Sequence, residues 1–107
     1  MGRRHQLATE HFKEIAASAQ KVWADQQWHG PIDNCDVCSR PMGDEQFMID
    51  GPAEATPDPK WGHICVICGY KYSPMIGWGK AQLYEKDRDG IWRLVAGGPR
   101  YSADCPL

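Results

Sequence analysis

The residues best suited to chemistry in this 107-residue chain are four cysteines in two pairs, Cys35 with Cys38 and Cys65 with Cys68. Each pair has the CxxC spacing, and twenty-six residues separate the two pairs. A CxxC turn can point both of its sulfur atoms at one ion, and two such turns supply the four thiolates of a closed tetrahedral site. We therefore predict one structural zinc ion bound by these four cysteines. Disulfides or a redox-active dithiol are the alternative uses of the same residues.

Two nearby groups are expected to stay off the metal. His63 lies two positions before Cys65, but four cysteines already complete a tetrahedron, so this side chain is expected to pack or hydrogen-bond at the rim of the site. Cys105 is the odd cysteine, and we expect it to be a free thiol.

The sequence does not favour catalysis. The HxE and PCxxC motifs of zinc deaminases do not occur. An HNH-type nuclease needs a histidine or asparagine after its second cysteine pair, but no histidine follows His63 and no asparagine follows Asn34. A zinc ion held by four thiolates also has no open position for water or substrate. We therefore expect a non-catalytic protein with no catalytic residues.

One long helix is expected before the first cysteine pair. Apolar residues recur at helical spacing and define one face, and Thr9 can serve as the N-cap. The sequence His29-Gly30-Pro31 supplies a stop. The pattern predicts a flexible arm over residues 1–8 and a helix over 9–30 that packs on the metal module through these positions: Phe12, Ile15, Ala16, Ala19, Val22 and Trp23.

Residues 31–98 are predicted to form the metal module, and residues 99–107 a tail. Short strands at 46–50 and 61–65, separated by a proline-rich loop, would bring one CxxC turn to the other. A later hairpin with a four-residue loop at 87–90 would place Leu83 opposite Leu94 and Tyr84 opposite Arg93. The fold class is therefore α+β: short antiparallel hairpins with one long N-terminal helix.

The segment from Cys65 to Pro74, CVICGYKYSP, resembles the CxxCGYxY(D/N)P knuckle of rubredoxins. The resemblance implies a zinc-ribbon or rubredoxin-like module, and with it the possibility of bound iron and electron transfer instead of structural zinc. The second CPxCG pair of rubredoxins is missing, because the chain stops at Cys105-Pro106-Leu107. A glycine-rich stretch leading into Gln82-Leu83-Tyr84 is also similar to small zinc-ribbon proteins of phages and mobile elements.

The distribution of charge suggests two kinds of partner. Residues 33–58 hold seven acids and one base, whereas residues 60–107 hold seven bases and four acids. The acidic half favours a protein partner met through Asp36, Asp44 and Glu45, with the protein acting as an inhibitor or adaptor of a larger complex. Interleaved bases and aromatics favour single-stranded nucleic acid as the alternative partner, met through Trp61, Tyr70, Lys71, Trp78 and Lys80.

The remaining expectations concern location. The sequence has no run of about 18 apolar residues, so no membrane span is expected. Cysteines used as thiolate ligands suit a reducing compartment, which predicts a cytoplasmic protein.

Overall fold

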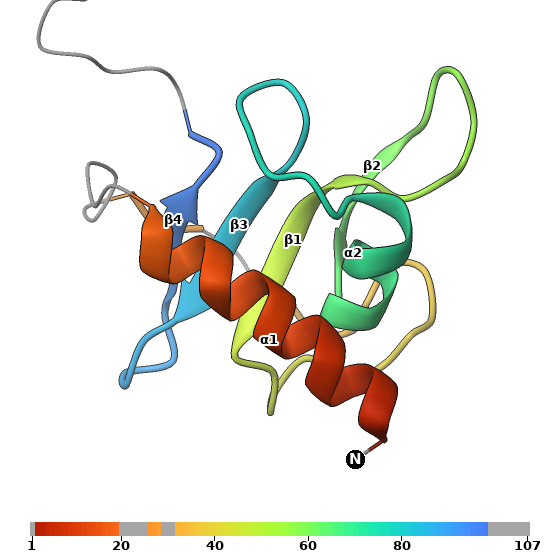
Figure 1. Ribbon diagram of the computed structural model, residues 1–107. Coiled ribbons are helices and arrows are strands. Elements are labelled where there is room, and N and C mark those ends of the chain that lie inside the picture. Colours follow the sequence, from red (N-terminus) through yellow and green to blue (C-terminus); the bar gives the residue numbers. More distant parts are fainter. Residues whose placement is uncertain (1, 20–25, 29–31, 99–107) are drawn as a thin grey trace, which may run out of the picture.

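The chain has an α+β fold, as expected, in which two helices lie on one face of an antiparallel sheet (Figure 1). The computed structural model describes residues 2–19, 26–28 and 32–98. In these residues the sheet has four strands in the order β2-β1-β3-β4. The elements in chain order are α1 (Arg3–Ser18), β1 (Phe47–Pro52), β2 (Trp61–Ile64), α2 (Val66–Tyr72), β3 (Gln82–Lys86) and β4 (Trp92–Ala96).

The two expected hairpins are parts of one sheet. Strands β1 and β2 pair around the loop at 53–60, with Ile49 opposite Ile64. Strand β1 also pairs with β3 along its other edge, where Met48 lies opposite Tyr84. Because β1 is shared, the hairpin that leads to the second cysteine pair and the C-terminal hairpin form a continuous surface for the helices.

The register predicted for the C-terminal hairpin is wrong, by one residue at Tyr84 and by two at Leu83. Tyr84 lies opposite Leu94, and an irregularity next to it places Leu83 opposite Ala96. The cause is the loop, in which the backbone N–H of Asp87 donates to the carbonyl of Ile91 and closes a five-residue connection. The Asp87 carboxylate also accepts hydrogen bonds from the backbone N–H groups of Asp89 and Ile91 at 2.8 and 3.0 Å. An Asx-type turn of this kind sets the register in place of the four-residue loop.

The bounds predicted for the N-terminal helix are also wrong. Helix α1 starts at Arg3 after Gly2, so residues 3–8 belong to it rather than to a flexible arm. It ends at Ser18, and Gln27 pairs with Arg93 at the edge of β4, so residues 26–28 are not helical. Tertiary contacts explain the early start, since Ala8 is buried and His5 binds Glu45 of the core. Val22, Trp23 and the stop at 29–31 lie outside the described residues.

The core lies between the helices and the sheet. Phe12 of α1 and Ile49 of β1 are fully buried, and both approach Gly69 of α2. A Cβ atom on Gly69 would lie 2.7 Å from Ile49 Cδ1 and 3.2 Å from Phe12 Cζ, so glycine permits the close approach of α2 to β1 and α1.

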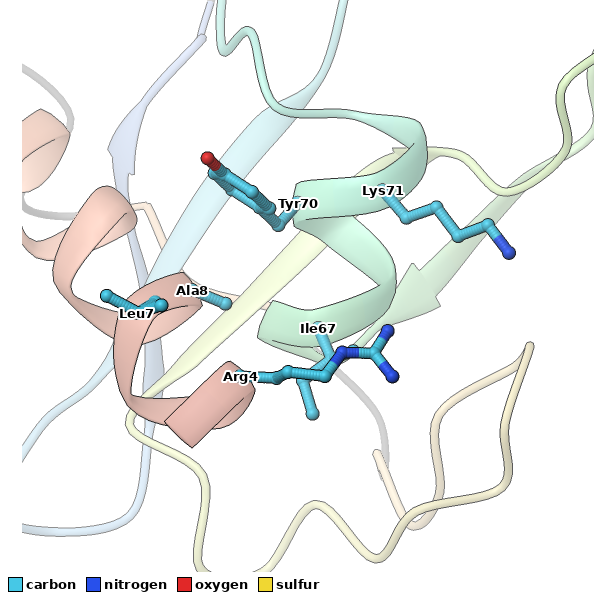
Figure 2. Close-up of a pocket in the computed structure, with 6 residues that line it drawn as sticks. All are labelled: Arg4, Leu7, Ala8, Ile67, Tyr70 and Lys71. Atoms are coloured by element: carbon cyan, nitrogen blue, oxygen red, sulfur yellow. The ribbon is translucent and has the colours of Figure 1, made fainter. Parts of the chain in front are cut away.

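Helices α1 and α2 pack on each other and leave a groove between their exposed sides (Figure 2). Arg4, Leu7 and Ala8 line it from α1, and Ile67, Tyr70 and Lys71 line it from α2. His11 fixes this packing, because its ring meets Tyr70 edge-on at 4.9 Å between centroids and its Nε2 lies 2.8 Å from the carbonyl oxygen of Pro74. Neither described helix has the length and apolar character needed to cross a membrane.

Candidate metal centre

The first cysteine pair lies on a tight backbone turn. The N–H of Cys35 donates to the carbonyl of Arg40, and the N–H of Ser39 donates back to the carbonyl of Cys35. Ser39 has φ of 64°, the left-handed conformation that closes such turns. The turn therefore presents Cys35 inward and Cys38 at the surface.

The second cysteine pair lies on a helix, which the sequence analysis did not predict. Cys65 precedes α2 as its N-cap residue, and Cys68 lies in the first turn. The chain passes directly from β2 into α2 at Cys65, so both sulfur atoms face the turn that carries Cys35 and Cys38. Both Cys65 and Cys68 are buried. Gly69, Tyr70 and Tyr72 are weak helix formers, so the sequence gives little indication of this helix.

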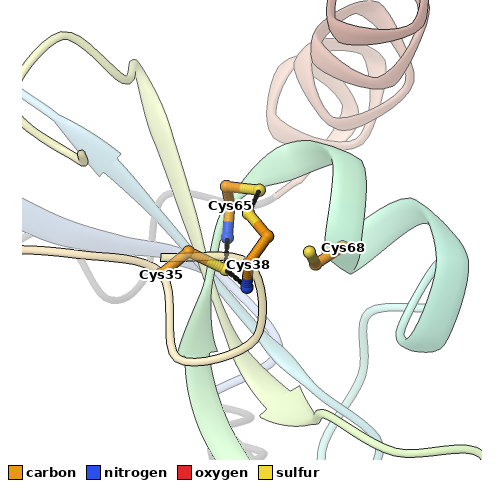
Figure 3. Close-up of side chains that lie close together, drawn as sticks. All are labelled: Cys35, Cys38, Cys65 and Cys68. Carbon is orange, nitrogen blue, oxygen red and sulfur yellow. Dashed lines mark hydrogen bonds between the residues drawn. The ribbon is translucent and has the colours of Figure 1, made fainter. Parts of the chain in front are cut away.

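The four sulfur atoms are positioned to bind one metal ion (Figure 3). All lie within 4.8 Å of one another, and the Sγ atoms of Cys38 and Cys65 are 3.7 Å apart. Zinc–sulfur bonds of about 2.3 Å in a tetrahedron require sulfur atoms about 3.8 Å apart. The donor set therefore fits a tetrahedral ion after a small contraction. None of these four cysteines forms a disulfide.

The electrostatics of the sulfur atoms also suit a cation. Burial alone would raise the pKa of Cys35, but hydrogen bonds from the backbone N–H groups of Cys38, Cys65 and Val37 outweigh it and lower that pKa. Burial raises the pKa of Cys65 to about 11, and burial with repulsion from the neighbouring sulfurs raises that of Cys68 further. A bound divalent cation supplies the charge that lets all four ionise together.

Asp36 attaches the first turn to the edge of β2. Its carboxylate accepts a hydrogen bond from the N–H of His63 at 2.8 Å, and its own N–H donates to the carbonyl of His63 at 3.0 Å. Its side chain also packs against Gly62, where a Cβ would lie 3.0 Å from the carboxylate. Asp36 was expected to meet a protein partner, and the structure gives it this positioning role between the two cysteine pairs.

His63 lies at the rim, as expected, and outside the sulfur cluster. Its ring packs against Trp28 at 4.1 Å between centroids, and its Nε2 lies 3.9 Å from the Asp50 carboxylate. Burial, opposed by His63 and reinforced by Asp36, raises the pKa of Asp50. Trp28 also contacts Tyr84 edge-on, so the 26–28 segment covers the sheet face that carries Asp50.

Glu45 does not lie on the surface, which corrects its expected role in partner binding. It is 3% exposed, and both of its carboxylate oxygens contact His5 Nε2, at 2.9 and 3.1 Å. Arg40 lies 3.9 Å away from the same carboxylate. These contacts attach α1 to the loop that follows the first cysteine pair. They could not be predicted from the sequence because His5 and Glu45 are forty residues apart. Asp44, in contrast, is exposed.

The aromatic residues expected to bind nucleic acid do reach the surface. Trp61, Tyr70 and Trp78 are each about half exposed, at 47%, 53% and 59%. Lys71 and Lys80 are exposed as well. Tyr70 and Lys71 line the α1–α2 groove, whereas Trp78 and Lys80 lie in the turn before β3.

The fold and the sulfur cluster together define a small α+β module with a four-cysteine metal site. Neither models of protein families, nor curated proteins, nor solved structures match this chain.

Proposed function

We propose that this protein is a non-catalytic zinc-binding module, of the zinc-ribbon or rubredoxin-like kind, that binds a protein partner. The supporting observation is the closed cluster of four sulfurs within 4.8 Å, three of whose cysteines are buried. Such a site stabilises a fold and leaves no coordination position for a substrate. Its role is that of an inhibitor or adaptor of a larger cytoplasmic complex, and the module itself resembles small zinc-ribbon proteins of phages and mobile elements.

The first test concerns the metal. We expect about one zinc ion per chain by elemental analysis, and we expect Cys68→Ser to lose both metal and cooperative folding, because structural zinc contributes roughly 10 kcal/mol or more to folding. Cys105→Ser is the matched control and should bind zinc like the parent. A red protein containing iron that cycles between oxidation states would replace this proposal with a rubredoxin-like electron carrier.

The protein partner is supported by exposed apolar side chains on several elements. Besides Tyr70 and Trp78, Leu7 and Met75 are 53% and 65% exposed. Large exposed aromatic and aliphatic side chains are typical anchors of protein interfaces. Affinity capture from native lysate, followed by mass spectrometry, should recover one protein partner reproducibly with the zinc-loaded parent. The Cys68→Ser variant should not recover it. Recovery of nucleic acid alone would contradict the proposed class of partner.

Single-stranded nucleic acid is the second candidate, favoured by the exposure of Trp61 and Trp78. In that case oligonucleotide affinity should fall steeply as salt rises, and Trp78→Ala should weaken binding by about 1–3 kcal/mol, the contribution of a stacked base. We expect no such binding at physiological salt. Micromolar affinity that survives charge reversal at Asp44 would favour nucleic acid instead.

A further inference from the structure

The groove between α1 and α2 has an apolar interior and two basic residues in its lining. Ala8 and Ile67 are buried or half-buried along it, and Leu7 and Tyr70 stand at its sides with about half of each side chain exposed. Its volume is about 410 Å³, enough for one large apolar side chain with part of its neighbours. An exposed apolar hollow of this kind indicates a contact site for another molecule.

The charged residues of the groove have one sign. Arg4 extends from the first turn of α1, and Lys71 extends from the last turn of α2 (Figure 2). Both are exposed, and no carboxylate lines the groove. Within the part of the chain that the structure describes, neither side chain forms an ion pair. The groove thus presents positive charge beside an apolar surface in a protein whose net charge is -2.

The walls of the groove are held in place before any partner arrives. Tyr70 is braced by the ring of His11, and Gly69 lets α2 approach Phe12 of α1 closely. His5, on the turn that carries Arg4, is anchored to the buried Glu45. A preformed groove loses little conformational entropy on binding, which favours affinity.

We propose that this groove binds an acidic peptide segment of a partner protein, with one large apolar side chain inserted between Leu7 and Tyr70 and carboxylates next to Arg4 and Lys71. The inference rests on the proposed protein-binding function and adds the chemistry of the partner. Charge complementarity selects an acidic segment, and the apolar interior selects an anchor side chain over a bare polyanion.

The test uses zinc-loaded full-length protein and short fluorescein-labelled peptides, followed by fluorescence anisotropy. One peptide has a central leucine flanked by glutamates, a second replaces the leucine by serine, and a third replaces the glutamates by lysines. We expect saturable binding of the first peptide only. Tyr70→Ala should weaken it about tenfold, and the double variant Arg4→Glu with Lys71→Glu should weaken it at least about fivefold and reduce its dependence on salt.

Controls separate the groove from general effects. Lys13→Glu reverses one charge, half the charge change of the double variant, on an exposed position of α1 that does not line this groove. It should bind the first peptide like the parent. Zinc content and thermal melting, measured on every variant, exclude loss of fold as the reason for weaker binding.

Four outcomes would overturn the inference. Equal binding of the serine peptide would mean a simple polyanion site, and groove-dependent binding of an oligonucleotide would assign the groove to phosphates. Concentration-dependent self-association lost in Tyr70→Ala would make a second copy the occupant. Failure of all peptides to bind the zinc-loaded parent would reject the groove as a peptide site. Capture of a protein partner through another surface would still be possible, so the groove proposal and the proposed protein-binding function can fail separately.

Discussion

The cysteines of the metal centre differ in what surrounds each sulfur. Cys35 Sγ accepts from the backbone N–H groups of Val37, Cys38 and Cys65 at 3.4 to 3.5 Å. Cys38 is exposed, so it is the sulfur that solvent and competing ligands can reach. The N–H of Cys65 connects the second pair to the first sulfur, and these hydrogen bonds orient the ligands even before an ion binds.

At the residue scale, Asp36 should control how firmly the metal is held. Asp36→Ala removes the carboxylate that accepts from the His63 N–H, and we expect a loss of about 1 kcal/mol in unfolding free energy. The turn that carries Cys35 and Cys38 should then detach from β2 more often, so zinc should pass to a chelator several times faster. Chelator competition measures this rate. Asp36→Asn keeps an acceptor and should fall between the parent and Asp36→Ala; equal rates in all three proteins would show that the contact does not matter for zinc retention.

The elements are held by a few contacts distant in sequence. His5 and Glu45 join α1 to the loop before β1, and the Lys86 Nζ donates to the carbonyls of Met42 and Gly43 at 3.1 and 2.6 Å. Lys86 Nζ also lies 4.7 Å from the centre of the Trp92 ring. The loop after the first cysteine pair is therefore attached both to α1 and to the C-terminal hairpin.

Gly69→Ala tests the close packing of α2. The added methyl would meet Ile49 at 2.7 Å in a fully buried position, and overpacking of a core costs about 1–3 kcal/mol. The better helix propensity of alanine offsets up to about 1 kcal/mol of this, so we expect a net loss of about 1 kcal/mol by chemical denaturation. Gly43→Ala, with nothing within 4 Å of the new methyl, should be nearly neutral. A neutral Gly69→Ala would mean that α2 moves freely relative to β1.

The turn at Asp87 should make the hairpin sensitive to acid. Hydrogen bonds from the Ile91 N–H, the Arg93 guanidinium and the Asp89 N–H lower the pKa of Asp87 below its ordinary value. A lowered folded-state pKa gives stability that is present above the unfolded pKa of about 3.9 and is lost as the pH falls through the folded-state pKa. Thermal melts of the parent and Asp87→Asn should therefore differ at neutral pH and converge in acid. A difference that persists at the lowest pH would assign the effect to geometry and not to charge.

The clustering of the four cysteines could be predicted from the sequence because CxxC is a local pattern, whereas the helix ends and the hairpin register depend on distant contacts. Thr9 suits an N-cap, yet α1 starts at Arg3 because His5 reaches Glu45, forty residues away in sequence. The hairpin register depends on which backbone groups the Asp87 carboxylate accepts from. Helix α2 forms although its residues favour other structures, because Val66 and Gly69 are buried against the sheet.

At the scale of the whole molecule, the metal centre and the hydrophobic core are one structure. Cys35, Cys65 and Cys68 belong to the same buried cluster as Phe12 and Ile49. Without the ion, the cysteines inside that cluster would have no cation to neutralise their charge when their thiols ionise. We therefore expect the metal and the fold to be lost together, as the small size of the chain also suggests.

Thermal melting at controlled free zinc tests this coupling. If only the folded chain binds zinc, each tenfold rise in free zinc above the dissociation constant should add about 1.4 kcal/mol to the unfolding free energy, and the melting temperature should rise steadily. Cys68→Ser, which lacks one ligand, should show little or no rise, and Cys105→Ser should follow the parent. Circular dichroism reports the helices and so tests whether α1, which carries no ligand, melts with the site. A melting temperature independent of zinc, with α1 unchanged after chelation, would mean that the core folds without the ion and that the metal serves some purpose other than stability.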